Sequence, residues 1–263
     1  MPVPSKADAQ RSYVSHAWAL IRTSAIELAS PPSAPGRAEA AQKLRRQLLW
    51  LAIIGAAAVV VLMFGFDATE ISMMPKRGDP SLWPARVLTD FGKDTYVLWV
   101  LIVALVAVAI AGPLLHGALR TRLLHLGTHL QYMFLALLLP IVFAEGIKWV
   151  VGRGRPFVGG KADPFNFAPF TGTGAYFSFP SAHCVTAFAL AFAVGAVWPR
   201  MRIVLFAYAV AIAATRLVLL AHHPSDVVGG AVIGLIGAIA MRYHFAARQL
   251  GFGIAEIGKI VPL

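Results

Sequence analysis

The chain carries little charge for its length, and this scarcity limits the kind of protein it can be. Only 13% of its 263 residues are charged, whereas 58% are hydrophobic, and the mean hydropathy is +0.71. This charged share is about half that of a soluble domain, so the composition indicates an integral membrane protein. The excess of 23 basic over 12 acidic residues does not indicate nucleic-acid binding, because the basic residues flank apolar runs instead of forming a stripe.

Cysteine is nearly absent. The single Cys184 excludes an internal disulfide and a metal site built from several thiolates. It lies in an apolar run directly after His183, and we expect it to be a small core residue. The alternative is a nucleophilic thiolate, but only the start of a helix would activate it there.

Long apolar runs, in contrast, are abundant. Six of them approach the ~20 residues that cross a bilayer as a helix. We therefore predict an all-α integral membrane bundle of six transmembrane helices, with short extracytoplasmic helices or loops between spans 1 and 2 and between spans 3 and 4. The predicted spans are residues 47–66, 96–115, 130–149, 181–198, 203–221 and 224–243.

The predicted membrane domain, residues 47–243, is flanked by two polar tails. Residues 1–46 lack the early apolar core of a cleavable signal peptide. Within this tail, residues 13–30 form either an amphipathic helix on the membrane surface or a loosely ordered segment. Residues 244–263 are the second tail. Residues 67–95, between the first two spans, are either an extracytoplasmic cap or a plain connector.

The distribution of Lys and Arg predicts the orientation. One side, made up of residues 1–46, 116–129, 199–202 and 242–263, holds 14 basic residues against four acidic ones, whereas the other side holds nine against eight. The positive-inside rule then places both termini in the cytoplasm. Three polar clusters fall on the opposite, periplasmic or extracellular side.

These three clusters contain the candidate functional residues. Charges near a bilayer are costly, so their presence indicates a function. Three cations, two histidines and a carboxylate are sufficient to bind a phosphate and transfer it to an imidazole. The clusters are Lys148-x6-Arg155-Pro156, Pro180-Ser181-Ala182-His183 and Thr215-Arg216-x5-His222-x3-Asp226.

The second cluster marks the start of a helix, because proline sets its first turn and Ser181 is a favoured N-cap. The free backbone amides of the following helix form an anion site, to which Ser181 adds a hydroxyl donor. His183 lies in the first turn, close enough to protonate a leaving oxygen. Alternatively, Ser181 is only a cap and His183 only a polar residue at the membrane boundary.

The first and third clusters supply the cations. Arg155 and Arg216 offer planar forks for phosphate oxygens, and Lys148 offers a point charge. Lys148 alternatively extends to the membrane interface or is neutralised by Glu145, one turn before it. Arg153 is the arginine least expected to bind phosphate. Arg216 lies inside an apolar run, where a guanidinium needs an anionic partner.

The third cluster also holds the candidate nucleophile. His222 and His223 precede Pro224 and are not expected to be helical. A hydrogen bond to Asp226, in the first turn of the last span, would fix the tautomer of an imidazole and leave its other nitrogen free to attack. Alternatively, Asp226 only compensates the helix dipole, His223 is the nucleophile, or the two histidines and Asp226 bind a metal, although no fourth ligand is evident.

Together these residues resemble the three signature motifs of the type 2 phosphatidic acid phosphatase superfamily, K-x6-R-P, P-S-G-H and S-R-x5-H-x3-D. The first motif matches in full. Ala182 replaces the usual glycine of the second, and Thr215 replaces the usual serine of the third. Alanine keeps the amide donor and threonine keeps a hydroxyl. The motifs cover residues 148–226, and the layout of spans extends the resemblance to residues 47–243.

The resemblance implies a role for each matched residue. His222 is the nucleophile that forms a phosphohistidine, Asp226 orients and polarises it, and His183 protonates the leaving group. The motif spacing favours His222 over His223. No metal or other cofactor is expected, because fixed cations and helix amides replace magnesium. The phosphoryl oxygens are bound by Lys148, Arg155, Ser181, Arg216 and the amide of Ala182.

The expected function is metal-independent hydrolysis of a lipid phosphate or pyrophosphate monoester at the extracytoplasmic face of a bacterial inner membrane. Family members act on phosphatidate, phosphatidylglycerophosphate, undecaprenyl pyrophosphate or lipid A, and the motifs do not choose among them. The expected partners are such a lipid and the bilayer, not a nucleic acid. Alternatives are a lipid phosphotransferase with the same intermediate, a vanadate-dependent haloperoxidase, which six spans disfavour, and a non-enzymatic phospholipid transporter.

Overall fold

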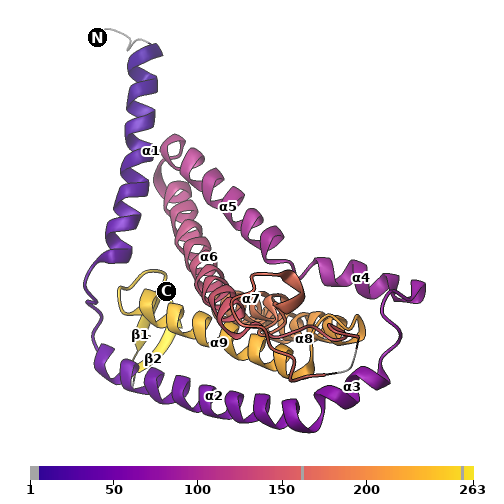
Figure 1. Cartoon of the computed structure of the whole chain (residues 1–263). Helices are drawn as coiled ribbons and strands as arrows, with labels where there is room; N and C mark the ends of the chain where they lie inside the picture. Colours follow the sequence, from indigo (N-terminus) through magenta and orange to yellow (C-terminus); the bar gives the residue numbers. More distant parts are fainter. Residues whose placement is uncertain (1–5, 161–162, 256–257) are drawn as a thin grey trace, which may run out of the picture.

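The computed structural model describes residues 6–160, 163–255 and 258–263, and nearly all of its regular structure is helical (Figure 1). The all-α prediction is confirmed. Short 3-10 helices cover Pro80–Leu82, Gly112–Leu114, Gly174–Tyr176 and Pro199–Met201. The other elements are α1 (Lys6–Ala29), α2 (Arg37–Gly65), α3 (Asp67–Met73), α4 (Trp83–Asp90), α5 (Asp94–Ala111), α6 (Gly117–Val151), α7 (Ala182–Val197), α8 (Arg202–Val218), α9 (Pro224–Ala246), β1 (Phe252–Ala255) and β2 (Lys259–Pro262).

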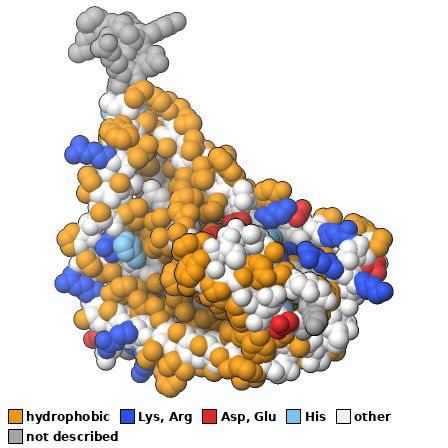
Figure 2. All heavy atoms as spheres, in the orientation of Figure 1, with side chains coloured by type: hydrophobic (Ala, Val, Ile, Leu, Met, Phe, Trp, Pro, Cys, Tyr) orange, Lys and Arg blue, Asp and Glu red, His pale blue; other side chains and the backbone are white. Residues whose placement is uncertain are grey.

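A helix coincides with each of the six predicted spans. Five helical segments of the described chain are long and apolar enough to cross a membrane, namely α2, the segment from Pro80 to Leu114, α6, the segment from Pro199 to Val218, and α9. The sixth, α7, is a shorter apolar helix of 16 residues. Large apolar side chains cover the outside of the bundle (Figure 2), as a bilayer requires; Ile203, for example, is 84% exposed.

The short α7 is the centre of the bundle, packed against α6, α8 and α9. Helices α7 and α9 approach closely because α9 carries glycine where it meets α7. A Cβ atom on Gly234 would lie 2.3 Å from the carbonyl oxygen of Val185, and one on Gly230 would lie 2.5 Å from that of Ser181. Small residues allow this kind of contact between membrane helices. The contact places the first turns of α7 and α9 side by side.

Two predicted loops or tails are ordered differently. Residues 117–129 were expected to be a loop but continue as the first part of α6, because no proline interrupts the chain before Pro140. At the C-terminal end, β1 and β2 pair as an antiparallel hairpin. Phe252 of this hairpin is buried against Tyr132 of α6, with ring centroids 4.8 Å apart. The hairpin is therefore attached to the bundle by a tertiary contact.

The N-terminal tail contains a helix, α1, which covers residues 13–29 of the predicted amphipathic segment. Figure 1 shows that α1 runs steeply to α2 and α9 and not alongside them. The hydroxyl of Tyr13 donates to the carbonyl of Ile110 at the end of α5, at 2.8 Å. The first tail is thus joined to the bundle at the end opposite to the polar clusters.

The connections at the other end form a cover. Between α2 and α5 lie the short helices α3 and α4, as predicted, and α4 packs on α8. The long connection between α6 and α7 folds back on itself, with the amide of Gly154 donating to the carbonyl of Asn166 at 2.8 Å. Both connections contribute side chains to the site described next.

Candidate active site

The predicted site residues converge at one end of the bundle, where α6 and α8 end and α7 and α9 begin (Figure 1). Lys148 is in the last turn of α6, and Arg216 is in the last turn of α8. Ser181 is the N-cap of α7, and Asp226 is in the first turn of α9. His222 lies in the turn that joins α8 to α9 and, as predicted, is not helical. The three clusters therefore form a single site.

His222 is held with one nitrogen occupied. Its Nδ1 lies 2.8 Å from the carbonyl oxygen of Ser178. A carbonyl only accepts, so Nδ1 carries the proton and Nε2 keeps its lone pair. Burial lowers the pKa of His222 to about 4, although the neighbouring Asp226 acts in the opposite direction. The imidazole is therefore neutral at pH 7, and the lone pair of Nε2 is not protonated.

Asp226 does not form the direct hydrogen bond to His222 that was expected from the sequence. Its Oδ2 lies 3.8 Å from His222 Nδ1, within range of charge but beyond a hydrogen bond. Oδ2 accepts from the Ser178 hydroxyl at 2.6 Å and from the His223 amide at 2.9 Å. Oδ1 accepts from Arg153 at 2.6 Å. Because other donors occupy the carboxylate, Asp226 orients His222 mainly through Ser178.

Arg153, which was not expected to bind phosphate, is 1% exposed and holds the site from behind. Its guanidinium bridges two carboxylates, with Nη2 2.8 Å from Asp67 and Nη1 2.6 Å from Asp226. The remaining donors reach the hydroxyl of Ser225 and the carbonyl of Pro164. Every guanidinium nitrogen has an acceptor, so Arg153 has no donor directed at a substrate.

Several atoms of the predicted phosphate site have no such partner. Ser181 makes no side-chain cap bond, and its buried hydroxyl has no hydrogen-bond partner among the described residues. The same holds for Nε2 of His183 and Nε of Arg216. Buried polar atoms are normally satisfied, so a group of unsatisfied donors needs an explanation. A bound anion is the explanation that fits their position at the start of α7.

Arg216 is buried, and within the described chain no carboxylate forms an ion pair with it. Among the described residues, its side chain donates to the hydroxyl of Thr89 in α4, which lies 2.7 Å from Nη1. The anionic partner that the sequence predicts for this guanidinium is therefore not supplied by the described protein. Arg216 and Lys148 both lie close enough to His183 for their charges to act on it, so the two cations and this histidine belong to one site.

Lys148 and Arg155, in contrast, each have a partner within the protein. Lys148 Nζ lies 2.5 Å from Glu145 Oε1, so the neutralising pair considered from the sequence is present. Glu145 is half exposed, and a phosphate would compete with it for the ammonium group. Arg155 donates Nε to the carbonyl of Gly174 at 3.0 Å, and its charge also acts on His222. Both cations therefore stand at the edge of the site.

Two alternative interpretations of the third cluster lose support. Both ring nitrogens of His223 are buried and have no partner among the described residues, so a substrate cannot reach them without rearrangement. Within the residues that the structure describes, no group of three or more His, Cys, Asp or Glu side chains is arranged to hold a metal ion. Cys184 is buried in the core, as expected.

Three participating residues were missed by the sequence analysis, namely Asp67, Thr89 and Ser178. Asp67 and Thr89 belong to the connection between the first two spans, which is therefore more than a plain connector. A carboxylate directly after an apolar span was a signal that could have identified Asp67. Thr89 and Ser178 have no distinguishing sequence pattern.

Comparisons with known proteins identify the family of the chain. The sequence model of the PAP2 superfamily matches residues 129–249, a range that contains all three motifs.

The chain belongs to the PAP2 superfamily.

Two curated relatives cover most of the PAP2 protein. It is 30% identical to the lipid A 1-phosphatase of Rhizobium johnstonii, over 76% of this chain and 82% of the relative. It is 31% identical to the lipid A 1-phosphatase of Rhizobium etli, over 82% of this chain and 91% of the relative. No solved structure matches the chain. Family and relatives together make this PAP2 member a lipid phosphate phosphatase.

Proposed function

We propose that this enzyme dephosphorylates a lipid A-type substrate, at the 1-phosphate, through a phosphohistidine on His222. The observation that carries the mechanism is the neutral His222, whose Nδ1 is bound to the Ser178 carbonyl, next to donors of Ser181, His183 and Arg216 that lack partners. The support for the substrate is the function of the two Rhizobium relatives, each covered over more than four-fifths of its length.

The first step forms a phosphorus–nitrogen bond and breaks the phosphorus–oxygen bond to the lipid. His222 Nε2 attacks the phosphorus atom in line with the leaving oxygen, which takes a proton from His183. The phosphate dianion favours the protonated form of His183. In the second step, water attacks the phosphohistidine, gives a proton back to His183 and releases inorganic phosphate.

The rate enhancement comes mainly from positioned charge. The transferred phosphoryl group spreads negative charge over its peripheral oxygens, and catalysis consists largely of stabilising that charge. Arg216, Ser181 and the free amides at the start of α7 are held in place before substrate binds. Lys148 and Arg155 add charge from the edge. Asp226 keeps the Ser178 segment, and hence His222, in register.

The site is proposed to face the periplasm from the inner membrane. The excess of basic residues at the opposite end of the bundle supports this orientation, because cytoplasmic loops retain Lys and Arg. The lipid tails would then stay in the outer leaflet while the phosphate enters the end of the bundle.

Phosphate release by the purified protein tests the substrate and the reaction. The assay compares lipid A, phosphatidate, phosphatidylglycerophosphate and undecaprenyl pyrophosphate in detergent, with a chelator present and with or without an acceptor lipid. We expect lipid A to be the best substrate and release to be independent of the acceptor. Phosphate that appears only on the acceptor lipid would identify a phosphotransferase, and movement of lipid without release would identify a transporter.

Orientation is tested by cysteine labelling in a Cys184→Ala background. Thr171 and Thr121 are two exposed threonines at opposite ends of the bundle, and each donates its hydroxyl to a nearby backbone carbonyl. We expect Thr171→Cys to react with a membrane-impermeant maleimide in intact spheroplasts, and Thr121→Cys to react only after lysis. The reverse pattern would place the site in the cytoplasm.

A further inference from the structure

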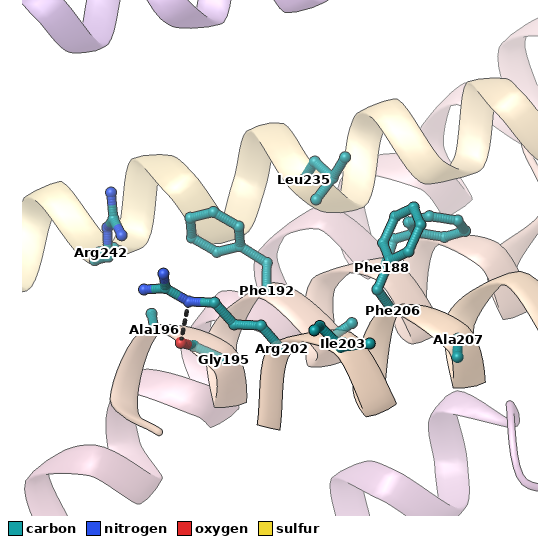
Figure 3. Close-up of a pocket in the computed structure, with 11 residues that line it drawn as sticks. Phe188, Phe192, Gly195, Ala196, Arg202, Ile203, Phe206, Ala207, Leu235 and Arg242 are labelled. Carbon is teal, nitrogen blue, oxygen red and sulfur yellow. Dashed lines mark hydrogen bonds between the residues drawn. The ribbon is translucent and has the colours of Figure 1, made fainter. Parts of the chain in front are cut away.

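A groove lined by apolar side chains and two arginines lies toward the end of the bundle opposite to the candidate active site. Helices α7, α8 and α9 enclose an apolar groove of about 670 Å³. Its walls include Phe188, Phe192 and Phe206, and two arginines, Arg202 and Arg242, lie toward one side of it (Figure 3). Arg202 begins α8, and Arg242 is in the last part of α9, so both lie far from the ends of these helices that adjoin Arg216 and His222.

Arg242 is half-buried, whereas Arg202 is exposed. In the described part of the chain, neither forms an ion pair with a carboxylate. Arg202 uses Nε to donate to the carbonyl of Gly195 at 2.9 Å. Arg242 places its guanidinium 5.1 Å from the ring centroid of Phe192, and its buried Nε has no hydrogen-bond partner among the described residues. A half-buried cation next to an aromatic ring in a membrane helix, such as Arg242, is stabilised by an anionic partner.

The rest of the groove is suited to a hydrocarbon chain. Phe188 and Phe206 meet edge to face across it, with ring centroids 6.0 Å apart. Ile203, which also lines it, is 84% exposed, so the groove opens on the outer surface of the bundle, where the bilayer lies. An occupant with an apolar tail and an anionic head matches both parts.

We propose that this groove binds an anionic phospholipid from the leaflet opposite to the active site, with its phosphate between Arg202 and Arg242 and one acyl chain along the phenylalanines. Basic pockets between transmembrane helices recognise anionic head groups in this way. The site is separate from the catalytic one, and its occupant is not the substrate. Because α7 and α9 carry the catalytic residues, a lipid wedged between them and α8 would stabilise the active packing.

Lipid retention and thermal unfolding test the proposal. The intact protein is placed in nanodiscs of phosphatidylglycerol or of phosphatidylcholine, its unfolding temperature is measured, and retained lipid is counted by native mass spectrometry. We expect phosphatidylglycerol to be retained and to raise the unfolding temperature. In R202Q/R242Q, we expect its affinity to fall about tenfold or more, as the loss of one or more charged contacts implies, and the stabilisation to disappear.

A matched control is Arg200→Gln, which removes an exposed arginine of the same turn that does not line the groove. It should retain phosphatidylglycerol as the wild type does. A second variant, Leu235→Trp, fills the groove without touching the arginines and should also displace the lipid. Equal retention of both lipids, retention by R202Q/R242Q at the wild-type level, or full stabilisation by inorganic phosphate alone would overturn the proposal.

Discussion

Two groups of buried polar side chains lie at the end of the bundle that holds the candidate active site. They differ in how completely their hydrogen bonds are satisfied. In the framework group, Arg153 is surrounded by Asp67, Asp226 and Ser225, and all its nitrogens have acceptors. In the second group, the candidate phosphate-binding residues Ser181, His183 and Arg216 each keep a buried atom without a partner among the described residues.

The difference separates residues that hold the fold from residues that wait for a ligand. A buried charge is costly unless it is paired and hydrogen-bonded, and the framework group meets that condition within the protein. The candidate phosphate-binding residues meet that condition only when an anion binds. Substitutions in the framework group should therefore reduce stability and activity together, whereas substitutions of the candidate phosphate-binding residues should reduce activity alone.

The largest effect on turnover is expected for His222→Ala. Removing the proposed nucleophile should lower the rate by a factor of at least ~10³, as loss of a catalytic nucleophile does, without a matching loss of stability. Phosphate release by the purified, folded variant measures the effect. His223→Asn is the control, since asparagine is a favoured residue at the N-cap position of α9, which His223 occupies. A normal rate for His222→Ala would refute the phosphohistidine.

The two neighbouring arginines provide the sharpest test of the comparison. Arg153→Met leaves Asp67 and Asp226 buried without their cation, which should cost about 3–5 kcal/mol and lower the unfolding temperature as well as the rate. Arg155→Met should lower the rate with little change in unfolding temperature. Thermal unfolding and phosphate release on both variants decide the matter, and similar stability of the two would remove the distinction.

A pair of serines repeats the comparison on a smaller scale. Ser181 and Ser225 both lie at the start of a helix, but the Ser225 hydroxyl is hydrogen-bonded to Arg153 and Asp67, whereas the Ser181 hydroxyl has no partner among the described residues. Ser181→Ala should lower the rate about tenfold, the value of one hydrogen bond to a charged group, with an unchanged unfolding temperature. Ser225→Ala should lower the unfolding temperature. Destabilisation by Ser181→Ala would mean that its hydroxyl is a cap after all.

The smallest effect is expected at Glu70, a buried neighbour of the framework group whose two carboxylate oxygens have no partner among the described residues. Burial, followed by the charges of Asp67 and Asp226, raises its pKa from 4.5 to about 7. A raised acid pKa favours the folded state below pH 4.5, and this contribution is lost as the pH rises through about 7.

Glu70→Gln should therefore remove part of the decline in stability between pH 5 and pH 8. Unfolding temperatures measured across this range should fall less steeply for Glu70→Gln than for the wild type, with the larger gain at pH 8. Parallel curves for the two proteins would show that Glu70 does not titrate in this range.

Much of the site could be predicted from the sequence because its residues follow local rules. Ser181 and Pro224 lie at helix starts, and the apolar runs between them have the length of membrane helices. Proline, serine and uninterrupted apolar runs act through neighbouring residues, so their consequences are visible in a linear reading. Arg216 and His222 were evident for a related reason, since a charged residue beside an apolar run is costly wherever the chain folds.

The framework group could not be predicted, because its partners are remote. Arg153 and Arg155 are the same residue type two positions apart, and no local rule says which one faces the carboxylates. The decision depends on Asp67, which is separated from Arg153 by 86 residues. The predicted contact between Asp226 and His222 failed for the same reason, because Arg153 and Ser178 occupy the carboxylate.

The sequence by itself determined the apolar helices, the family and the set of candidate catalytic residues, since these depend on hydrophobicity and on short motifs. Only the tertiary structure decided which carboxylates stay paired within the protein, which donors stay open to a phosphate, and that Arg202 and Arg242 line the same groove. Those outcomes depend on helix packing, in which Gly230 and Gly234 bring α7 and α9 together. Contacts between residues distant in sequence are formed by the whole fold and are not encoded by any one segment.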